Sequence, residues 1–204
     1  MYWLLPKPLY SSLRKTLHFK LPTTSFHLEI FLKGLGASQM LLEKAVEGNA
    51  FFEAVVLLKN QIDGLLRFSV VLKLQTVSVI SEMEMQWIIQ KRGVPNKTFS
   101  DVEEKATQLD ILTPEIKTEL RSCLVEFDFL VNNFITSSVV LPDIERFAAR
   151  LYKLMKALQS IVYGLESEQI EKGVGMARNT DEADLKLRGE DFKSKIGKET
   201  YFPG

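Results

Sequence analysis

Apolar residues recur at helical spacing between Thr113 and Ser138. Steps of three and four residues keep one stripe on one face of a helix with about 3.6 residues per turn. Thr113 can cap the first free amides, and Pro114 suits the first helical position, where an N–H has no partner. Cys123 and Leu130 widen the face, so we expect this helix to lie between others and to organise the fold. The stripe consists of Ile116, Leu120, Leu124, Phe127, Val131 and Phe134.

A second pattern predicts the longest helix, from Ala50 to about Lys91. Within it, the stretch from Leu74 to Ile80 alternates apolar and polar residues, which is also typical of a strand. We interpret this stretch as helix because the sequence offers no partner strand, and a break there is the alternative. The loop residues from Arg92 to Pro95 end the element. The predicted buried face comprises Val55, Leu58, Ile62, Leu65 and Leu72, thickened by Phe52, Val56, Leu66 and Val70.

An earlier segment, Phe26 to Gly48, is predicted to be helical with an interruption at Gly34–Gly36 and a restart capped by Ser38. These glycines do not form a dinucleotide-binding loop, because the third glycine and the surrounding βαβ unit are missing. Further along, Ser100 and Glu103 match a capping box that would open a short helix.

The last predicted helix follows Pro142 and has Gly164 near its end. Its apolar residues at helical spacing are Ile144, Phe147, Leu151, Leu154, Leu158 and Ile161. Together these segments predict an all-α protein, an up-and-down helical bundle without a substantial sheet.

Three regions follow from this pattern. Residues 1–25 form a basic N-terminal arm without acidic residues, for which an organelle-targeting segment is the alternative. Residues 26–165 form the helical bundle domain. Residues 166–204 form a charged tail rich in glycine, which we expect to be flexible or laid along the surface and to contribute little to the core.

Composition narrows the possible functions. Lys and Arg together number 26, as do Asp and Glu, so net charge gives no support for binding nucleic acid, which stays possible only through a local basic patch. No run of residues is apolar enough for a membrane helix, and the single cysteine, Cys123, suits a reducing, cytoplasmic location. His18 and His27 are the only histidines, and neither has a second ligand at metal spacing. We therefore expect no metal ion and no cofactor.

Two stretches resemble the HEPN domains, the higher eukaryote and prokaryote nucleotide-binding family. Leu41 to Leu66, LLEKAVEGNAFFEAVVLLKNQIDGLL, is similar to that family's first helical hairpin. Phe99 to Thr136, FSDVEEKATQLDILTPEIKTELRSCLVEFDFLVNNFIT, is similar to its segment of short helix, leucine-rich turn and long helix. In active members that long helix carries R-N-x-x-x-H, and those members resemble metal-independent ribonucleases.

On that motif, Val131 takes the position of the arginine, Asn132 that of the asparagine and Thr136 that of the histidine. An aliphatic side chain cannot attract a phosphate, and a threonine hydroxyl does not titrate near neutral pH. The resemblance thus implies a HEPN-like fold that lacks the side chains for ribonuclease activity. Asn132 and Asn133 are more simply explained as a pair that satisfies a polar pocket or a contact between helices.

The leading hypothesis is a catalytically inactive, HEPN-like domain that acts through protein contacts, in a regulatory role like members similar to the mannitol operon repressor. The expected partner is a second copy, forming a homodimer, or another protein. One alternative is a ribonuclease with a relocated site that uses His18 or His27 with Arg67 or Arg121. The other is a tetratricopeptide-like scaffold, against which the absence of a repeated copy argues.

Overall fold

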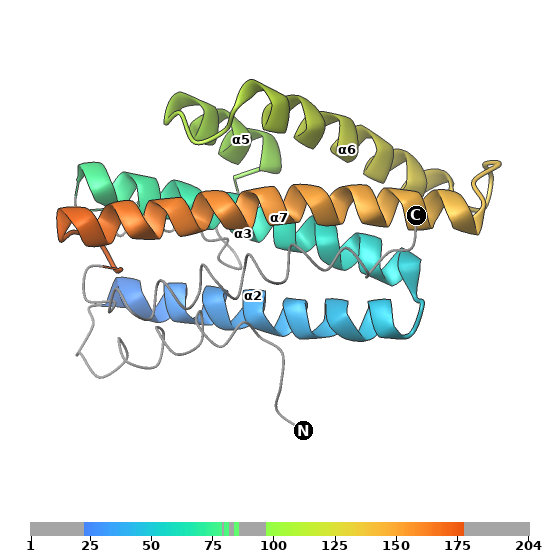
Figure 1. The fold of residues 1–204 in the computed structure, drawn as a ribbon, viewed down its shortest axis with the longest axis horizontal. Helices are drawn as coiled ribbons and strands as arrows, with labels where there is room; N and C mark the ends of the chain where they lie inside the picture. The colour runs from blue at the N-terminus through green and yellow to red at the C-terminus, as the bar shows by residue number, and fades with distance from the viewer. Residues whose placement is uncertain (1–22, 79, 82–83, 86–96, 178–204) are drawn as a thin grey trace.

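The computed structural model describes residues 23–78, 80–81, 84–85 and 97–177, with side chains from Ile30 onward. These residues form five α-helices and no strand, so the predicted all-α class is confirmed. In Figure 1, α2 (Thr23–Glu47), α3 (Phe51–Val77) and α7 (Leu141–Lys172) run along the length of the bundle. The shorter α5 (Phe99–Gln108) and α6 (Pro114–Asn133) lie along one side.

Helix α3 is the centre of the fold. It packs against α7, α2 and α5, and nearly every residue from Gln61 to Leu72 is buried. A helix that is apolar or buried on all sides belongs to the interior of a bundle. The expectation that the helix beginning at Thr113 organises the chain is therefore wrong. That helix, α6, buries only Leu120, Cys123 and Leu130, and it lies at the edge of the bundle.

Helix α2 is continuous through Gly34 and Gly36, so the predicted interruption is wrong. Packing against α3 explains how the helix tolerates glycines that cost roughly 1 kcal/mol each. At the crossing, a Cβ added to Gly64 would lie 2.6 Å from Leu35 Cδ1, so any larger residue there would require the Leu35 side chain to shift. The buried Gln61 amide adds a hydrogen bond of 2.7 Å to the carbonyl of Leu35.

Helix α3 ends earlier than the sequence pattern predicted. The alternating stretch from Leu74 is helical through Val77, and Ser78 then adopts an extended conformation with φ −155°. The predicted continuation toward Lys91 is thus wrong at Ser78, Ile80 and Ser81, whereas Glu84 and Met85 are helical. Residues 79, 82–83 and 86–96 lie outside the described part of the chain.

The N-cap of the short helix α5 lies two residues before the predicted cap, Ser100. Thr98 caps it, and the carboxylate of Asp101 accepts hydrogen bonds from the backbone N–H and the hydroxyl of Thr98 at 2.7 and 2.9 Å. Glu103, predicted to serve the cap, is instead buried and forms an ion pair of 2.9 Å with Arg121 on α6. The start of α6 is as predicted: Thr113 accepts from the N–H of Ile116, and Pro114 opens the helix.

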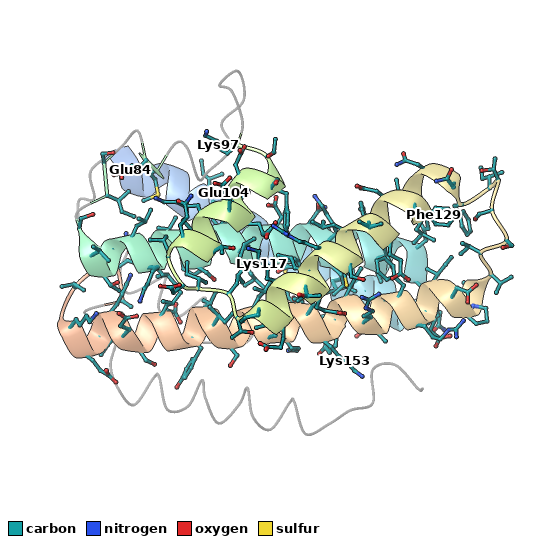
Figure 2. The ribbon with its side chains drawn as sticks, turned by 90° about the horizontal axis from the view of Figure 1, so that it is seen from above. Glu84, Lys97, Glu104, Lys117, Phe129 and Lys153 are labelled. Carbon is teal, nitrogen blue, oxygen red and sulfur yellow. The ribbon has the colours of Figure 1, made fainter. Side chains whose placement is uncertain are left out.

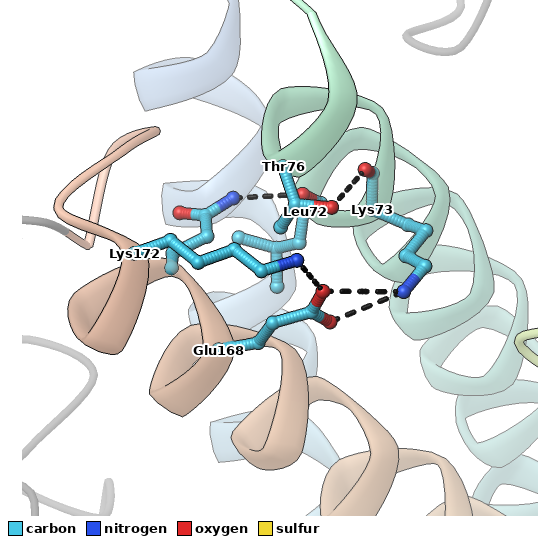
Figure 3. A network of polar contacts seen from close by, with 6 residues as sticks. Leu72, Lys73, Thr76, Glu168 and Lys172 are labelled. Carbon is cyan, nitrogen blue, oxygen red and sulfur yellow. Dashed lines mark hydrogen bonds and ion pairs between the residues drawn. The ribbon is translucent and has the colours of Figure 1, made fainter.

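Helix α7 passes the predicted end near Gly164 and continues to Lys172. The side chain of Gln169 is fully buried, and its amide donates to the carbonyl of Leu72 on α3 at 2.8 Å. Figure 3 shows the neighbouring carboxylate of Glu168 between the ammonium groups of Lys73 and Lys172. The boundary expected at residue 165 therefore cuts through a helix that belongs to the bundle, whereas residues 178–204 and 1–22 lie outside the described part.

Candidate functional site

The four motif positions, Val131, Asn132, Asn133 and Thr136, lie in the last turn of α6 and the turn that follows it. Their polar side chains are engaged locally. The amide of Asn132 donates to the carbonyl of Asp128 at 2.8 Å, and that of Asn133 to the carbonyl of Phe129 at 3.0 Å. Both bonds join residues four apart, a common way to satisfy an Asn side chain inside a helix.

The two asparagines therefore bond to their own helix, and neither a polar pocket nor a contact with another helix explains them. Thr136 donates its hydroxyl to the carbonyl of Asn133 at 3.3 Å, and Val131 is exposed. None of the four side chains titrates near neutral pH, so this cluster offers neither a general base nor a cation for a phosphate.

The arginines considered for a relocated ribonuclease site are both engaged in ion pairs. Arg67 is 3% exposed, bonds to Asp63 at 2.9 Å and donates to the carbonyl of Lys97 at 3.0 Å. Arg121 forms its ion pair with Glu103. His18 and the side chain of His27 lie outside the described part of the chain, so the pairing of either histidine with Arg67 or Arg121 stays a prediction.

Large apolar side chains are exposed around the end of α6, in a region we call the corner surface. Figure 2 shows Phe129 near the C-terminal end of α6, beside the turn into α7. Ile135, in that turn, is 94% exposed. The start of α3 contributes Phe52, whose ring lies 5.3 Å from that of Phe134 between centroids. The corner surface consists of Phe52, Val125, Phe129, Val131, Phe134, Ile135, Val140 and Leu141.

The segment that carries most of this surface, Phe129–Pro142, contains no charged residue, in a chain that is 25% charged. Singly exposed apolar residues are common, but a group of them in an uncharged segment marks an interaction site more often than chance. Helical spacing places Val131 and Phe134 on the predicted buried face of α6, and therefore did not predict this exposed surface. The uncharged segment was the signal in the sequence that could have revealed it.

Several carboxylates lie close in sequence to residues of the corner surface. Glu126 pairs with Arg150 and Asp143 pairs with Arg146, but Glu145 has no cation partner among the described residues. The same is true of three further exposed carboxylates, Glu47, Glu53 and Asp128. Over the described residues 44–53 and 125–150, which contain the corner surface, the chain has these six carboxylates and three cations, Lys44, Arg146 and Arg150.

Arg150 fixes α6, and with it the corner surface, on α7. Its guanidinium donates to Glu119 at 2.5 and 3.1 Å, to Glu126 at 2.5 Å and to the hydroxyl of Ser122 at 2.7 Å. The hydrogen bond from Arg150 lowers the pKa of Glu119 below its usual 4.5. The planar guanidinium carries several N–H donors in a fixed geometry, which suits it to bind two carboxylates at once.

Cys123 lies beneath this network and is buried. Burial away from water raises the pKa of its thiol to about 12, since the thiolate loses solvation there. A thiol with such a pKa is not a nucleophile at neutral pH, so Cys123 serves as a small apolar core residue.

Among residues 23–78, 80–81, 84–85 and 97–177, no three His, Cys, Asp or Glu side chains gather as metal ligands would. Within the same residues, every helix is too short or too polar to cross a membrane. Comparisons of the chain with models of protein families, with curated proteins and with solved structures found no match.

Proposed function

We propose that this protein is a catalytically inactive, HEPN-like helical domain that acts in a regulatory role through protein contacts at the corner surface. The observation that carries the proposal is the exposure of Phe129, Ile135 and their apolar neighbours in an uncharged segment. Exposed aromatic and aliphatic side chains of this kind supply the buried anchors of protein interfaces.

The chemistry at the end of α6 supports the absence of catalysis. Cleavage of RNA without a metal needs a group that exchanges protons near neutral pH and a cation opposite the phosphate. Val131, Asn132 and Thr136 supply neither, and Arg67 is buried in its ion pair with Asp63.

The tetratricopeptide-like alternative has less support. Helices α2 and α3 are 25 and 27 residues long. A tetratricopeptide repeat accommodates both of its helices and their turns in about 34 residues. The α2–α3 hairpin is too long for that unit.

The proposal includes a cytoplasmic location, because a reducing compartment keeps the lone Cys123 as a thiol. Whether the partner is a second copy or another protein was open from the sequence, and a homodimer is kept only as the alternative to another protein. The two are separated by the experiments below.

Site-specific photo-crosslinking tests the contact. Benzoylphenylalanine replaces Phe129 in one variant and Val77 in the control. Val77 is also an exposed apolar residue, but it is the last residue of α3, whereas the corner surface includes Phe52 at the start of that helix. In cells that naturally make the protein, illumination should give a discrete protein adduct from position 129 and none from position 77. Equal adducts at both positions, or none at 129, would contradict the proposal.

Catalytic inactivity is tested by incubating the purified protein with structured and single-stranded RNA in the presence of a chelator. We expect no cleavage. Cleavage that disappears in His18→Ala or His27→Ala would favour the relocated-site ribonuclease instead.

A further inference from the structure

We infer that the corner surface binds a basic amphipathic segment of a partner protein, one that presents apolar side chains flanked by lysine or arginine. This inference rests on the proposed function and names the chemistry of its partner. Its basis is the combination of an apolar centre with an excess of carboxylates around it.

The exposed apolar residues of the corner surface indicate that the partner presents apolar side chains. Phe129 and Ile135 are 51% and 94% exposed, and Val140 and Leu141 extend the surface onto the first turn of α7. The polar side chains among them are already bonded, because Asn132 and Asn133 donate to carbonyls of their own helix. An incoming side chain therefore meets few polar groups that need a partner, which favours apolar contact.

The carboxylates near the corner surface indicate that the partner also presents lysine or arginine. Asp128 adjoins Phe129 on α6, Glu53 adjoins Phe52 on α3, and neither has a cation partner among the described residues. Uncompensated carboxylates at the rim attract a basic segment and orient it. They repel the phosphates of nucleic acids and of anionic lipids, so both are disfavoured as occupants.

The same charges disfavour a second copy. A two-fold axis through the corner surface brings the same residues of two chains together, and the excess carboxylates then face one another. Arg146 and Arg150 offset this only in part, since each is already paired within the chain. Like charges across an interface oppose association.

Two synthetic peptides test the inference: an amphipathic helix of leucine and lysine, and its counterpart with glutamate in place of every lysine. Binding to the full chain is measured by fluorescence anisotropy, while analytical ultracentrifugation follows self-association. We expect the Leu/Lys peptide to bind and the Leu/Glu peptide not to bind. Raising the salt from about 0.05 M to about 0.5 M should weaken binding, because the rim contacts are screened.

Variants locate the site. Phe129→Asp should weaken binding of the Leu/Lys peptide at least about tenfold, whereas Val77→Asp should leave it unchanged. Phe129→Ser replaces Phe129→Asp if circular dichroism shows that the charged variant does not fold. Exchanging the rim carboxylates in a double variant, Glu53→Lys with Asp128→Lys, should shift the preference toward the Leu/Glu peptide.

Three results would overturn the inference: no binding of either peptide, equal binding of both, or self-association of the chain that Phe129→Asp abolishes. The last would assign the surface to a second copy. If neither peptide binds while benzoylphenylalanine at position 129 still crosslinks to protein, the proposed function stands and only the partner's chemistry is wrong.

Discussion

The buried amide of Gln169 on α7 donates a hydrogen bond of 2.8 Å to the backbone carbonyl of Leu72 on α3, joining residues 97 positions apart. The same amide also donates to Gln75 at 3.1 Å, and its oxygen accepts from the N–H of Ala177. One side chain thus joins the end of α3, the end of α7 and the segment beyond α7. This makes residues 169–177 part of the bundle.

Replacing Gln169 by leucine should therefore destabilise the protein. The change keeps the volume but leaves the carbonyl of Leu72 and the N–H of Ala177 without this partner, which costs about 1–3 kcal/mol for a buried group. Urea denaturation should show the loss, and Gln108→Leu on the exposed face of α5 serves as the control. Equal stability of both variants would mean that water replaces the amide.

Gly173 and Gly175 provide a matched pair for a second test. Both have positive φ, 63° and 68°, so alanine is strained at either position. A Cβ at Gly175 would also lie 2.4 Å from Gln169 Cδ, whereas a Cβ at Gly173 meets nothing within 4 Å. Because Gln169 is held by three hydrogen bonds, Gly175→Ala should cost about 1 kcal/mol or more beyond Gly173→Ala. Denaturation midpoints that coincide would show that Gln169 moves aside freely.

The packing of α6 predicts that alanine substitutions at two of its apolar positions differ strongly in their effect on the free energy of unfolding. Leu120 is 1% exposed and Val125 is 72% exposed. Leu120→Ala should lower the free energy of unfolding by about 2–5 kcal/mol, because it leaves a cavity. Val125→Ala should change it by less than about 0.5 kcal/mol. Similar losses at both positions in thermal or urea denaturation would show that α6 is buried more evenly than the structure indicates.

The ion pair of Glu119 with Arg150 predicts a modest loss of stability in acid. Because the pKa of Glu119 is lower in the folded protein, the pair stabilises the fold above about pH 4.5 and is lost as the pH falls through the folded value. Both side chains are more than a third exposed, so solvent screening limits the effect to about 0.5 kcal/mol.

Arg150→Met should thus have a lower free energy of unfolding than the unaltered protein at about pH 7. Between about pH 5 and about pH 3, its free energy of unfolding should fall by less than that of the unaltered protein, because the ion pair is already absent. Arg146→Met, at a more exposed arginine, is the control. An unchanged pH profile of the denaturation midpoint in Arg150→Met would show that this pair does not contribute.

Cys123 should resist thiol reagents in the native state. Its burial and its pKa of about 12 leave almost no thiolate at neutral pH. We expect slow reaction with Ellman's reagent at about pH 7.5 and rapid reaction once urea unfolds the chain. Rapid reaction of the folded protein would mean that α6 opens readily from α7.

The local pattern of residues determined the all-α class and the start of α6. Thr113 and Pro114 define a helix start within four residues, because a cap needs only its own first turn. Helical spacing likewise depends only on residues close together in the chain, so the sequence predicted that α3 and α7 are helices. For the candidate site, the same local information showed that Val131 and Thr136 lack ribonuclease chemistry.

Tertiary structure alone decided which helix is central and which apolar residues are exposed. Spacing reveals an apolar face but not how many neighbours cover it, so α6 and α3 looked alike, although α3 is enclosed and α6 lies at the edge. Continuity of α2 through Gly34 depends on packing against α3, and the end of the bundle depends on Gln169 reaching Leu72. These outcomes depend on contacts between residues far apart in the chain, and periodicity carries no information about such contacts.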